Sequence, residues 1–200
     1  MAAKLLVGVC RDQKSKEEGR RTEIAFYPLR GLNPNGGVFL SSELSEERCK
    51  ALDDGTPAKS VQGLRRLTDP DKEPQDAAEL LARAAAAAAC LGCYGTKIVK
   101  DHQSGAWIAQ GNMSEAALRV AAYKGGYPED SFACRELRNN NPRDSVMEVL
   151  FSPKRKMSAT VHQLPSNRRC ATLLFGKDHT HFVILKGAPD RIMGNLSAVL

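Results

Sequence analysis

The residues best suited to bind a phosphate group lie near the carboxyl end of the chain. Residues 182–185 (Phe-Val-Ile-Leu) form an apolar run rich in β-formers, and Lys186, Gly187 and then Pro189 follow it. This pattern predicts a strand, a tight exit and the first turn of a helix. Gly187 lets a ligand approach the backbone, and a lysine supplies a point charge suited to phosphate. By itself, however, the pattern is more typical of an ordinary sheet edge.

A second candidate is Glu115. Residues 106–109 (Ala-Trp-Ile-Ala) predict a strand that leads into Gly111 and Asn112. Asn112, followed three positions later by Glu115, has the spacing of a capping box, and the helix that begins there is expected to end at Gly125-Gly126. The residue pattern alone therefore assigns Glu115 only the closure of a helix amino terminus.

A third candidate is a basic hairpin. Residues 146–151 predict a strand with Met147, Val149 and Phe151 on one face, and residues 157–164 pair with it across Pro153-Lys154-Arg155-Lys156. An exposed basic turn is an ordinary surface feature, and a nucleic-acid patch is an alternative. The chain has few aromatic residues and one short basic cluster here, which is a thin footprint for a nucleic-acid backbone.

The composition is that of a globular domain. The chain has 200 residues, 42% hydrophobic and 26% charged, which is enough for one well-buried core. Its net charge of +6 favours an anionic partner as well as solubility. No apolar run reaches the roughly 18 residues of a transmembrane helix, and residues 5–9 lack the flanks of a signal peptide. We therefore expect a soluble, monomeric fragment.

Cysteine and histidine give no pattern typical of a metal site. Six cysteines, at positions 10, 49, 90, 93, 134 and 170, are scattered through a chain too large to need disulfides, so a reduced compartment is expected. Cys90 and Cys93 form a C-x-x-C, but no second pair completes a zinc site. His179 and His181 alternate on a predicted strand and are expected at the surface.

Three motifs in the same order resemble those of one family. Residues 186–190 (Lys-Gly-Ala-Pro-Asp) look like the KGAP(E/D) motif of the nucleotide-binding domain of P-type cation-transporting ATPases. Residues 111–118 resemble its GDPTE-x-AL segment, and residues 151–158 resemble its F-S-x-x-R-K-x-M-S segment. Residues 31–37 also look like the G-Y-N-P-x-G turn near the start of such domains. The resemblance covers most of the chain, and its motifs favour the calcium- and sodium-type branch.

The resemblance implies a set of ATP-binding residues. Glu115 would lie near the adenine, where a carboxylate can accept from the exocyclic amino group. Phe151 would lie under the adenine ring, because every base offers a π-face for stacking. Lys156 and Lys186, with Gly187 beside them, would reach the ribose or the phosphates. No residue of this chain is expected to be catalytic or to bind a metal directly, and the cofactor is ATP, as Mg-ATP in the intact enzyme.

The chain departs from the family pattern at two places. Pro153 stands where many members carry an arginine that helps to hold the phosphates, so Lys154 or Arg155 would have to supply that charge. Met157 follows Lys156 one residue earlier than usual, which reverses the alternation of the strand unless a tighter turn or a bulge compensates. Both departures bear on ATP affinity.

The fold class implied is α+β, with helices flanking a twisted, mainly antiparallel β-sheet. Residues 1–200 would form a single nucleotide-binding domain with a polar surface insertion at about 41–75 that buries little. Asp76 is predicted to cap a helix that ends at Gly92. Further strands are predicted at residues 4–10, 22–27, 38–40, 169–175 and 180–185. The last strand of the family's domain is expected to lie after residue 200.

The function implied is the ATP-binding step of a cation pump. The domain would deliver the γ-phosphate to an aspartate on the phosphorylation domain, with the actuator domain as a further partner, at the cytoplasmic face of a membrane. The phosphorylated aspartate lies in a DKTGT motif that this chain lacks, so the fragment should bind ATP without turning it over. A dissociation constant of about 1 mM is expected. The transported cation cannot be read from this sequence.

Two alternatives differ from this reading. One is a basic adaptor that binds RNA or acidic protein through Lys154-Arg155-Lys156 and Arg168-Arg169. The other keeps the fold but has lost nucleotide binding. Stoichiometric ATP binding that is lost in Phe151→Ala would favour the ATP-binding domain over both alternatives.

Overall fold

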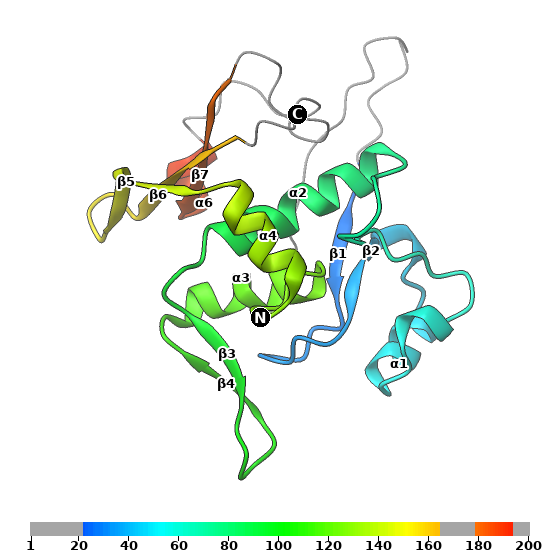
Figure 1. Cartoon of the computed structure of the whole chain (residues 1–200). Helices are drawn as coiled ribbons and strands as arrows, with labels where there is room; N and C mark the ends of the chain where they lie inside the picture. Colours follow the sequence, from blue (N-terminus) through cyan, green and yellow to red (C-terminus); the bar gives the residue numbers. More distant parts are fainter. Residues whose placement is uncertain (1–21, 165–178, 194–200) are drawn as a thin grey trace. The chain divides into compact units, whose positions relative to one another are not determined.

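The computed structural model describes residues 22–164 and 179–193 (Figure 1). The chain divides between Ala133 and Cys134 into two compact units, which we describe in turn. Helices and antiparallel sheets alternate along the chain, which confirms the α+β class. The described strands form three small sheets, two of two strands and one of three. The predicted strands at residues 4–10 and 169–175 lie outside the described residues.

The first unit opens with the predicted hairpin. Strand β1 (Ile24–Tyr27) pairs antiparallel with β2 (Gly37–Leu40), from Ile24 opposite Leu40 to Tyr27 opposite Gly37. Gly36 closes the turn with φ of +129°, and a Cβ there would come within 2.2 Å of the Tyr27 carbonyl oxygen. Only glycine fits this position, because it has neither the Cβ nor the restriction on positive φ.

The segment after β2 is more ordered than its polar composition predicts. It contains the helix α1 (Glu46–Asp53) and the short 3₁₀ turns η1 (Ser41–Glu43) and η2 (Ala58–Ser60). Leu52 and Leu67 are only 4% and 3% exposed. Thr68 is the third buried residue of the segment, and all the others are half-buried or exposed, so this polar stretch buries little and reaches the core through two isolated leucines and one threonine.

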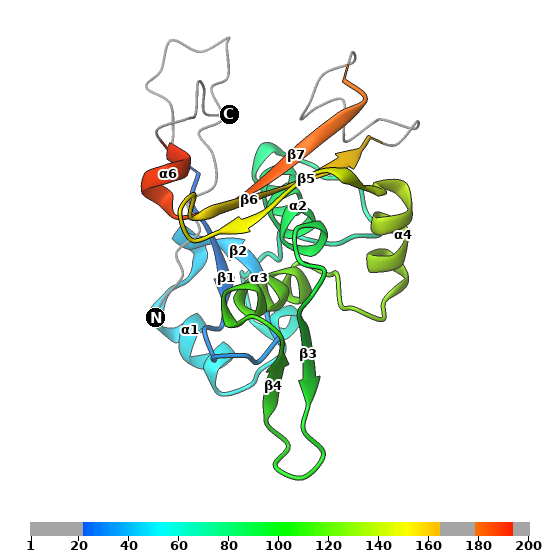
Figure 2. The same ribbon diagram turned by 90° about the vertical axis from the view of Figure 1, so that its left-hand side faces the viewer.

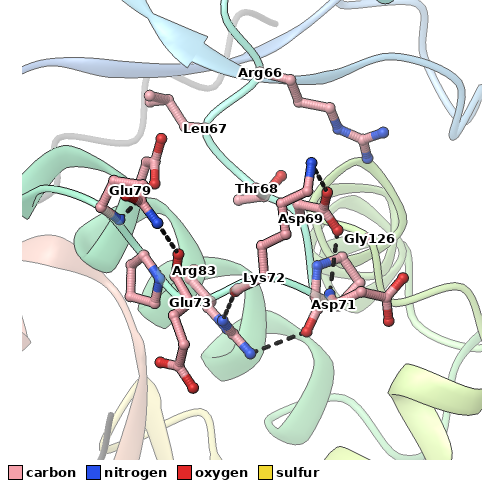
Figure 3. A pocket seen from close by; sticks show the side chains of 13 residues that line it. Arg66, Leu67, Thr68, Asp69, Asp71, Lys72, Glu73, Glu79, Arg83 and Gly126 are labelled. Atoms are coloured by element: carbon pink, nitrogen blue, oxygen red, sulfur yellow. Dashed lines mark hydrogen bonds and ion pairs between the residues drawn. The ribbon is translucent and has the colours of Figure 1, made fainter.

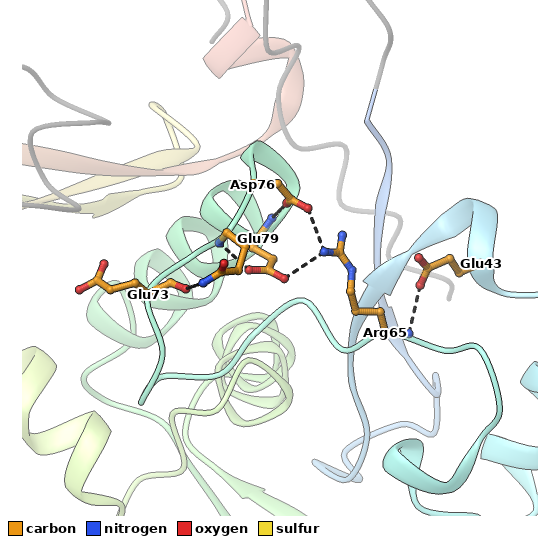
Figure 4. Close-up of polar contacts among 6 residues, drawn as sticks. Glu43, Arg65, Glu73, Asp76 and Glu79 are labelled. Carbon is orange, nitrogen blue, oxygen red and sulfur yellow. Dashed lines mark hydrogen bonds and ion pairs between the residues drawn. The ribbon is translucent and has the colours of Figure 1, made fainter.

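An ionic cluster fastens this segment to the next helix (Figure 4). The Arg65 guanidinium lies 2.9 Å from the carboxylate of Asp76 and 3.1 Å from that of Glu79, while the Arg65 backbone N–H donates to Glu43. The pKa of Asp76 is lowered, first by the hydrogen bond from the Glu79 backbone N–H and then by Arg65. Arg65 and Asp76 are each more than two-fifths exposed, so their ion pair contributes only about 0.2–1 kcal/mol.

Two helices form the centre of the first unit. Helix α2 (Ala77–Leu91) begins at Asp76, whose carboxylate accepts from the Glu79 N–H at 2.9 Å, and it ends at Gly92, both as predicted. It packs against α3 (Met113–Lys124). A Cβ on Gly125 would lie 2.1 Å from the Ala86 Cβ, so the two helices approach closely where α3 ends.

A second hairpin packs against α3. Strand β3 (Lys97–Lys100) pairs antiparallel with β4 (Trp107–Gln110), and Figure 2 shows the hairpin extending away from the helix. Ile98 is buried against Ala116 and Val120 of α3. The strand predicted at residues 106–109 is thus confirmed with a shift of one residue.

The second unit is a three-stranded antiparallel sheet. Helix α4 (Phe132–Asn140) leads into β5 (Arg143–Ser152), and the strand order is β5, β6 (Met157–Gln163), β7 (His181–Gly187). Helix α6 (Pro189–Met193) follows directly, as predicted from the proline. His162 is fully buried and stacks on Phe182 of β7, with ring centroids 5.3 Å apart. His179 and His181 are exposed, as expected.

Two searches over the described residues were negative. None of the helices there combines the length and the apolar character that a membrane span requires. Nor do three or more His, Cys, Asp or Glu side chains in this part of the chain gather as ligands for a metal ion.

Candidate functional site

The structure brings together three of the predicted site residues at one end of the β6–β7 pair. Met157 lies opposite Gly187, and Ser158 lies opposite Lys186. The Ala188 N–H donates to the Lys156 carbonyl oxygen at 3.0 Å. A Cβ on Gly187 would lie 2.5 Å from that same oxygen, so glycine is needed for this approach. Lys156, Lys186 and Gly187 therefore belong to one local structure.

Lys156 has an unusual backbone conformation. Its φ is +55°, and among the described residues it is the only non-glycine with positive φ. The turn is closed by the hydrogen bond from the Lys156 N–H to the Ser152 carbonyl at 2.7 Å. A left-handed lysine costs about 1 kcal/mol, so the contacts on both sides of the turn hold it in place.

A bulge compensates for the shortened turn. Val149 lies opposite Ala159, and Ser152 lies opposite Met157, so three steps along β5 match two steps along β6. The extra residue in β5 is the bulge that the early position of Met157 made necessary. Further irregularity between Asp144 and Val149 interrupts the simple alternation predicted for this strand.

Phe151 lies in this bulged part of β5 and is 63% exposed. Its neighbour Ser152 pairs with Met157, so the ring lies one residue from the end of the hairpin. Such an exposed aromatic side chain presents a face on which a flat ligand can stack.

The basic turn offers charge at the same end of the sheet. Lys154 and Arg155 are both exposed, and the Arg155 guanidinium donates to the Leu150 carbonyl at 2.7 Å. Of the two residues that stand near Pro153, Arg155 is therefore tied to its own hairpin, and Lys154 is better placed to contact an anionic ligand.

Glu115 lies in the first unit, in the first turn of α3. The Asn112 side chain accepts from the N–H groups of Ser114 and Glu115 at 2.8 and 3.3 Å, which confirms the predicted cap. In a capping box the Glu115 carboxylate would accept directly from the Asn112 N–H. Here Thr96, which the sequence did not indicate, lies between these two groups. The Asn112 N–H donates to the Thr96 hydroxyl at 3.1 Å, and that hydroxyl donates to the Glu115 carboxylate at 3.2 Å.

Close backbone packing supports this arrangement. Thr96 is 1% exposed. Gly111 has φ of +126°, and a Cβ there would lie 2.7 Å from the Thr96 hydroxyl oxygen. Glycine at 111 thus allows β4 and the start of α3 to approach Thr96.

A buried arginine, which the sequence also did not indicate, holds the segment that carries Thr96. Arg119 of α3 is fully buried; its Nε donates to the Thr96 carbonyl at 3.2 Å, and its guanidinium also donates to the Cys93 carbonyl. Glu129 lies 3.2 Å from the same guanidinium. A buried charge needs such partners, so loss of Arg119 would loosen the Glu115 region.

A hollow of about 490 Å³ lies elsewhere in the first unit, within the loop 66–75 (Figure 3). Arg83 closes it by donating to the carbonyls of Pro70 and Lys72. Its lining includes none of the predicted site residues, and its carboxylates outnumber its cationic side chains. This charge is unsuited to a triphosphate, so we do not place the nucleotide there.

Comparison with known proteins agrees with the motifs. A family model described as P-type ATPase, cytoplasmic domain N, matches residues 82–200. The chain is 32% identical to a P-type sodium-transporting ATPase4 of Toxoplasma gondii, over 96% of this chain and 15% of the relative. It is 30% identical to a P-type sodium-transporting ATPase4 of Plasmodium falciparum, over 100% of this chain and 16% of the relative. The chain thus spans a small part of the length of these curated relatives.

Proposed function

The chain belongs to the cytoplasmic N domains of P-type cation-transporting ATPases, and we propose that it binds ATP and positions the γ-phosphate for transfer to an aspartate on a separate domain. The observation that carries this proposal is the contact between the Lys156 turn and the exit of β7 at Gly187. Lys156, in the turn that leads into β6, and Lys186, on the neighbouring β7, lie at this same end of the strand pair, while the Lys156-Met157 backbone fills the space beside Gly187. This combination suits a phosphate chain.

In this proposal the base and the phosphates have separate contacts. Phe151 stacks on the adenine, and Lys156 and Lys186 neutralise the ribose-phosphate end. Pro153 stands where many members of the family carry an arginine, and Lys154 supplies part of that positive charge. For Glu115 the proposal rests on the motif resemblance alone, which implies that its carboxylate accepts a hydrogen bond from the exocyclic amino group of the base. One stacking residue and a few exposed charges support a dissociation constant of about 1 mM.

We further propose that the full-length protein is an ATP-driven cation pump of the sodium type. Both relatives carry that activity in their names. Phosphoryl transfer would take place on an aspartate of the phosphorylation domain, with the actuator domain as a further partner, at the cytoplasmic face of a membrane. Mg²⁺ would enter bound to ATP and neutralise phosphate charge. The side chains described here would hold and orient the nucleotide.

Titration of the isotope-labelled chain with ATP, followed by NMR, tests the binding. We expect saturable shifts near Phe151, Lys156 and Lys186, and loss of binding in Phe151→Ala. Val146→Ala is the matched control, because Val146 is an apolar residue of the same strand that is 91% exposed. The absence of shifts in the wild-type chain up to several times the ~1 mM estimate would contradict the proposal. Binding of a single-stranded RNA oligomer with equal strength would favour the adaptor function.

A further inference from the structure

We propose that Thr96 is a positioning residue that sets the preference for adenine over other purines by holding the Glu115 carboxylate; this inference rests on the proposed ATP-binding function. Thr96 is 1% exposed and does not itself need to touch the ligand. Its hydroxyl lies between the Asn112 N–H at 3.1 Å and the Glu115 carboxylate at 3.2 Å.

The direction of these hydrogen bonds follows from the chemistry of the groups. A hydroxyl has one proton and two lone pairs, and a backbone N–H can only donate. The Thr96 oxygen therefore accepts from Asn112 and directs its own proton toward Glu115. The Asn112 carbonyl, at 3.5 Å, is the more distant acceptor. The hydroxyl thus holds one carboxylate oxygen of Glu115 in a fixed orientation.

Thr96 is itself fixed from several directions. Arg119 donates to its carbonyl oxygen at 3.2 Å and to the Cys93 carbonyl, so the backbone that carries Thr96 cannot shift easily. Gly111 leaves no room on the side of the hydroxyl, since even a Cβ would lie within 2.7 Å of it. The Glu115 carboxylate is therefore held by a chain of buried contacts that begins in the body of α3.

A carboxylate held in this way can read a purine. An ionised carboxylate has about four lone-pair positions, so it can accept from Thr96 and from a ligand at the same time. Adenine presents an amino donor where hypoxanthine presents a carbonyl acceptor. A site built to accept that donor discriminates against an analogue that lacks it. If the carboxylate could rotate, this discrimination would weaken.

The test compares the dissociation constants for ATP and ITP by NMR titration. In the wild-type chain we expect ATP to bind more tightly than ITP. Thr96→Val keeps the shape of the side chain and removes the hydroxyl, so we expect ATP binding to weaken about fivefold with ITP binding unchanged. Thr96→Ser keeps the hydroxyl, so this variant should keep the wild-type preference for ATP over ITP.

Thr68→Val is the matched control, because it makes the same chemical change at another buried threonine of the same unit. Thr68 is 2% exposed, and its hydroxyl has no hydrogen-bond partner among the described residues. The Thr68→Val chain should prefer ATP over ITP to the same degree as the wild type. If Thr96→Val does not fold, Thr96→Cys, with its weak S–H donor, replaces it in the comparison.

The outcomes separate the inference from the proposed function. A wild-type chain that binds no ATP contradicts the proposed function itself. A wild-type chain that binds ATP without preferring it to ITP, or a Thr96→Val chain that keeps the wild-type ratio, overturns the inference alone. Equal weakening of both nucleotides would leave Thr96 with a purely structural role and would also overturn the inference.

Discussion

Gly187 lies so close to Lys156 that a methyl group on it would come within 2.5 Å of the Lys156 carbonyl oxygen. The Ala188 N–H donates to the same oxygen at 3.0 Å. The strand exit and the basic turn are therefore mechanically connected, and a change at one of them must move the other.

Gly187→Ala tests this connection. The added methyl would displace the Lys156-Met157 backbone, so we expect a loss of about 1–3 kcal/mol in the free energy of unfolding, measured in urea. ATP binding should weaken as well, because the turn carries Lys156. Gly95→Ala is a steric control for stability, since a Cβ there would meet nothing closer than 4.0 Å. Equal stability of the two variants would mean that the close approach at Gly187 is relieved at no cost.

The left-handed conformation of Lys156 gives a second prediction. Lys156→Gly and Lys156→Ala both remove the charge, but only glycine adopts φ of +55° without strain. We expect the glycine variant to be more stable than the alanine variant by about 1 kcal/mol, with both equally weakened in ATP binding. Thermal unfolding and NMR titration of the pair separate the turn from the charge. Stronger ATP binding by the glycine variant would show that the turn, rather than the charge, governs affinity.

Thr68 gives a prediction about stability alone. Its buried hydroxyl has no hydrogen-bond partner among the described residues, so it keeps a desolvation cost without compensation. Thr68→Val should raise the free energy of unfolding by about 1 kcal/mol. Thr160→Val makes the same change where the hydroxyl is bonded to the buried His162 ring at 3.1 Å, and it should destabilise the chain. The same sign of change in both variants would contradict this account.

Local signals predicted much of the fold. Asp76, Gly92, Asn112 and Gly125 mark helix ends through interactions with residues three or four positions away, so they could be read from sequence. Strand β3 is not evident, because a four-residue strand with lysines at both ends gives little periodicity.

The candidate site was predictable only in part. Its residues were identified from motif resemblance, and the packing of Gly187 against Lys156 agrees with two motifs acting together. Thr96 and Arg119 could not be identified from the sequence, because each acts through partners that lie 16 or more positions away along the chain. The bulge in β5 depends on its pairing with β6 and could be expected only from the shortened turn.

Lys124 makes stability depend on pH. This lysine of α3 is 2% exposed and donates to the Pro28 carbonyl oxygen. Burial, and to a lesser degree Arg30, lowers its pKa to about 8 from an ordinary value of 10.5, although Asp53 acts in the opposite direction. Between these two pH values the unfolded chain binds more protons than the folded one, so this group makes the folded state more stable as pH rises.

Comparison with Lys124→Met isolates this effect, because every other titrating group is common to both proteins. From pH 7 to 9.5 the free energy of unfolding of the wild type, measured relative to that of the variant, should rise by about 2 kcal/mol. Burial and the Asp53 hydrogen bond raise the pKa of Tyr27, which lowers the stability of both proteins alike above pH 10 and so does not enter the difference between them. A constant difference between the two proteins would mean that Lys124 stays charged in the folded state throughout this range, and that water reaches its ammonium group.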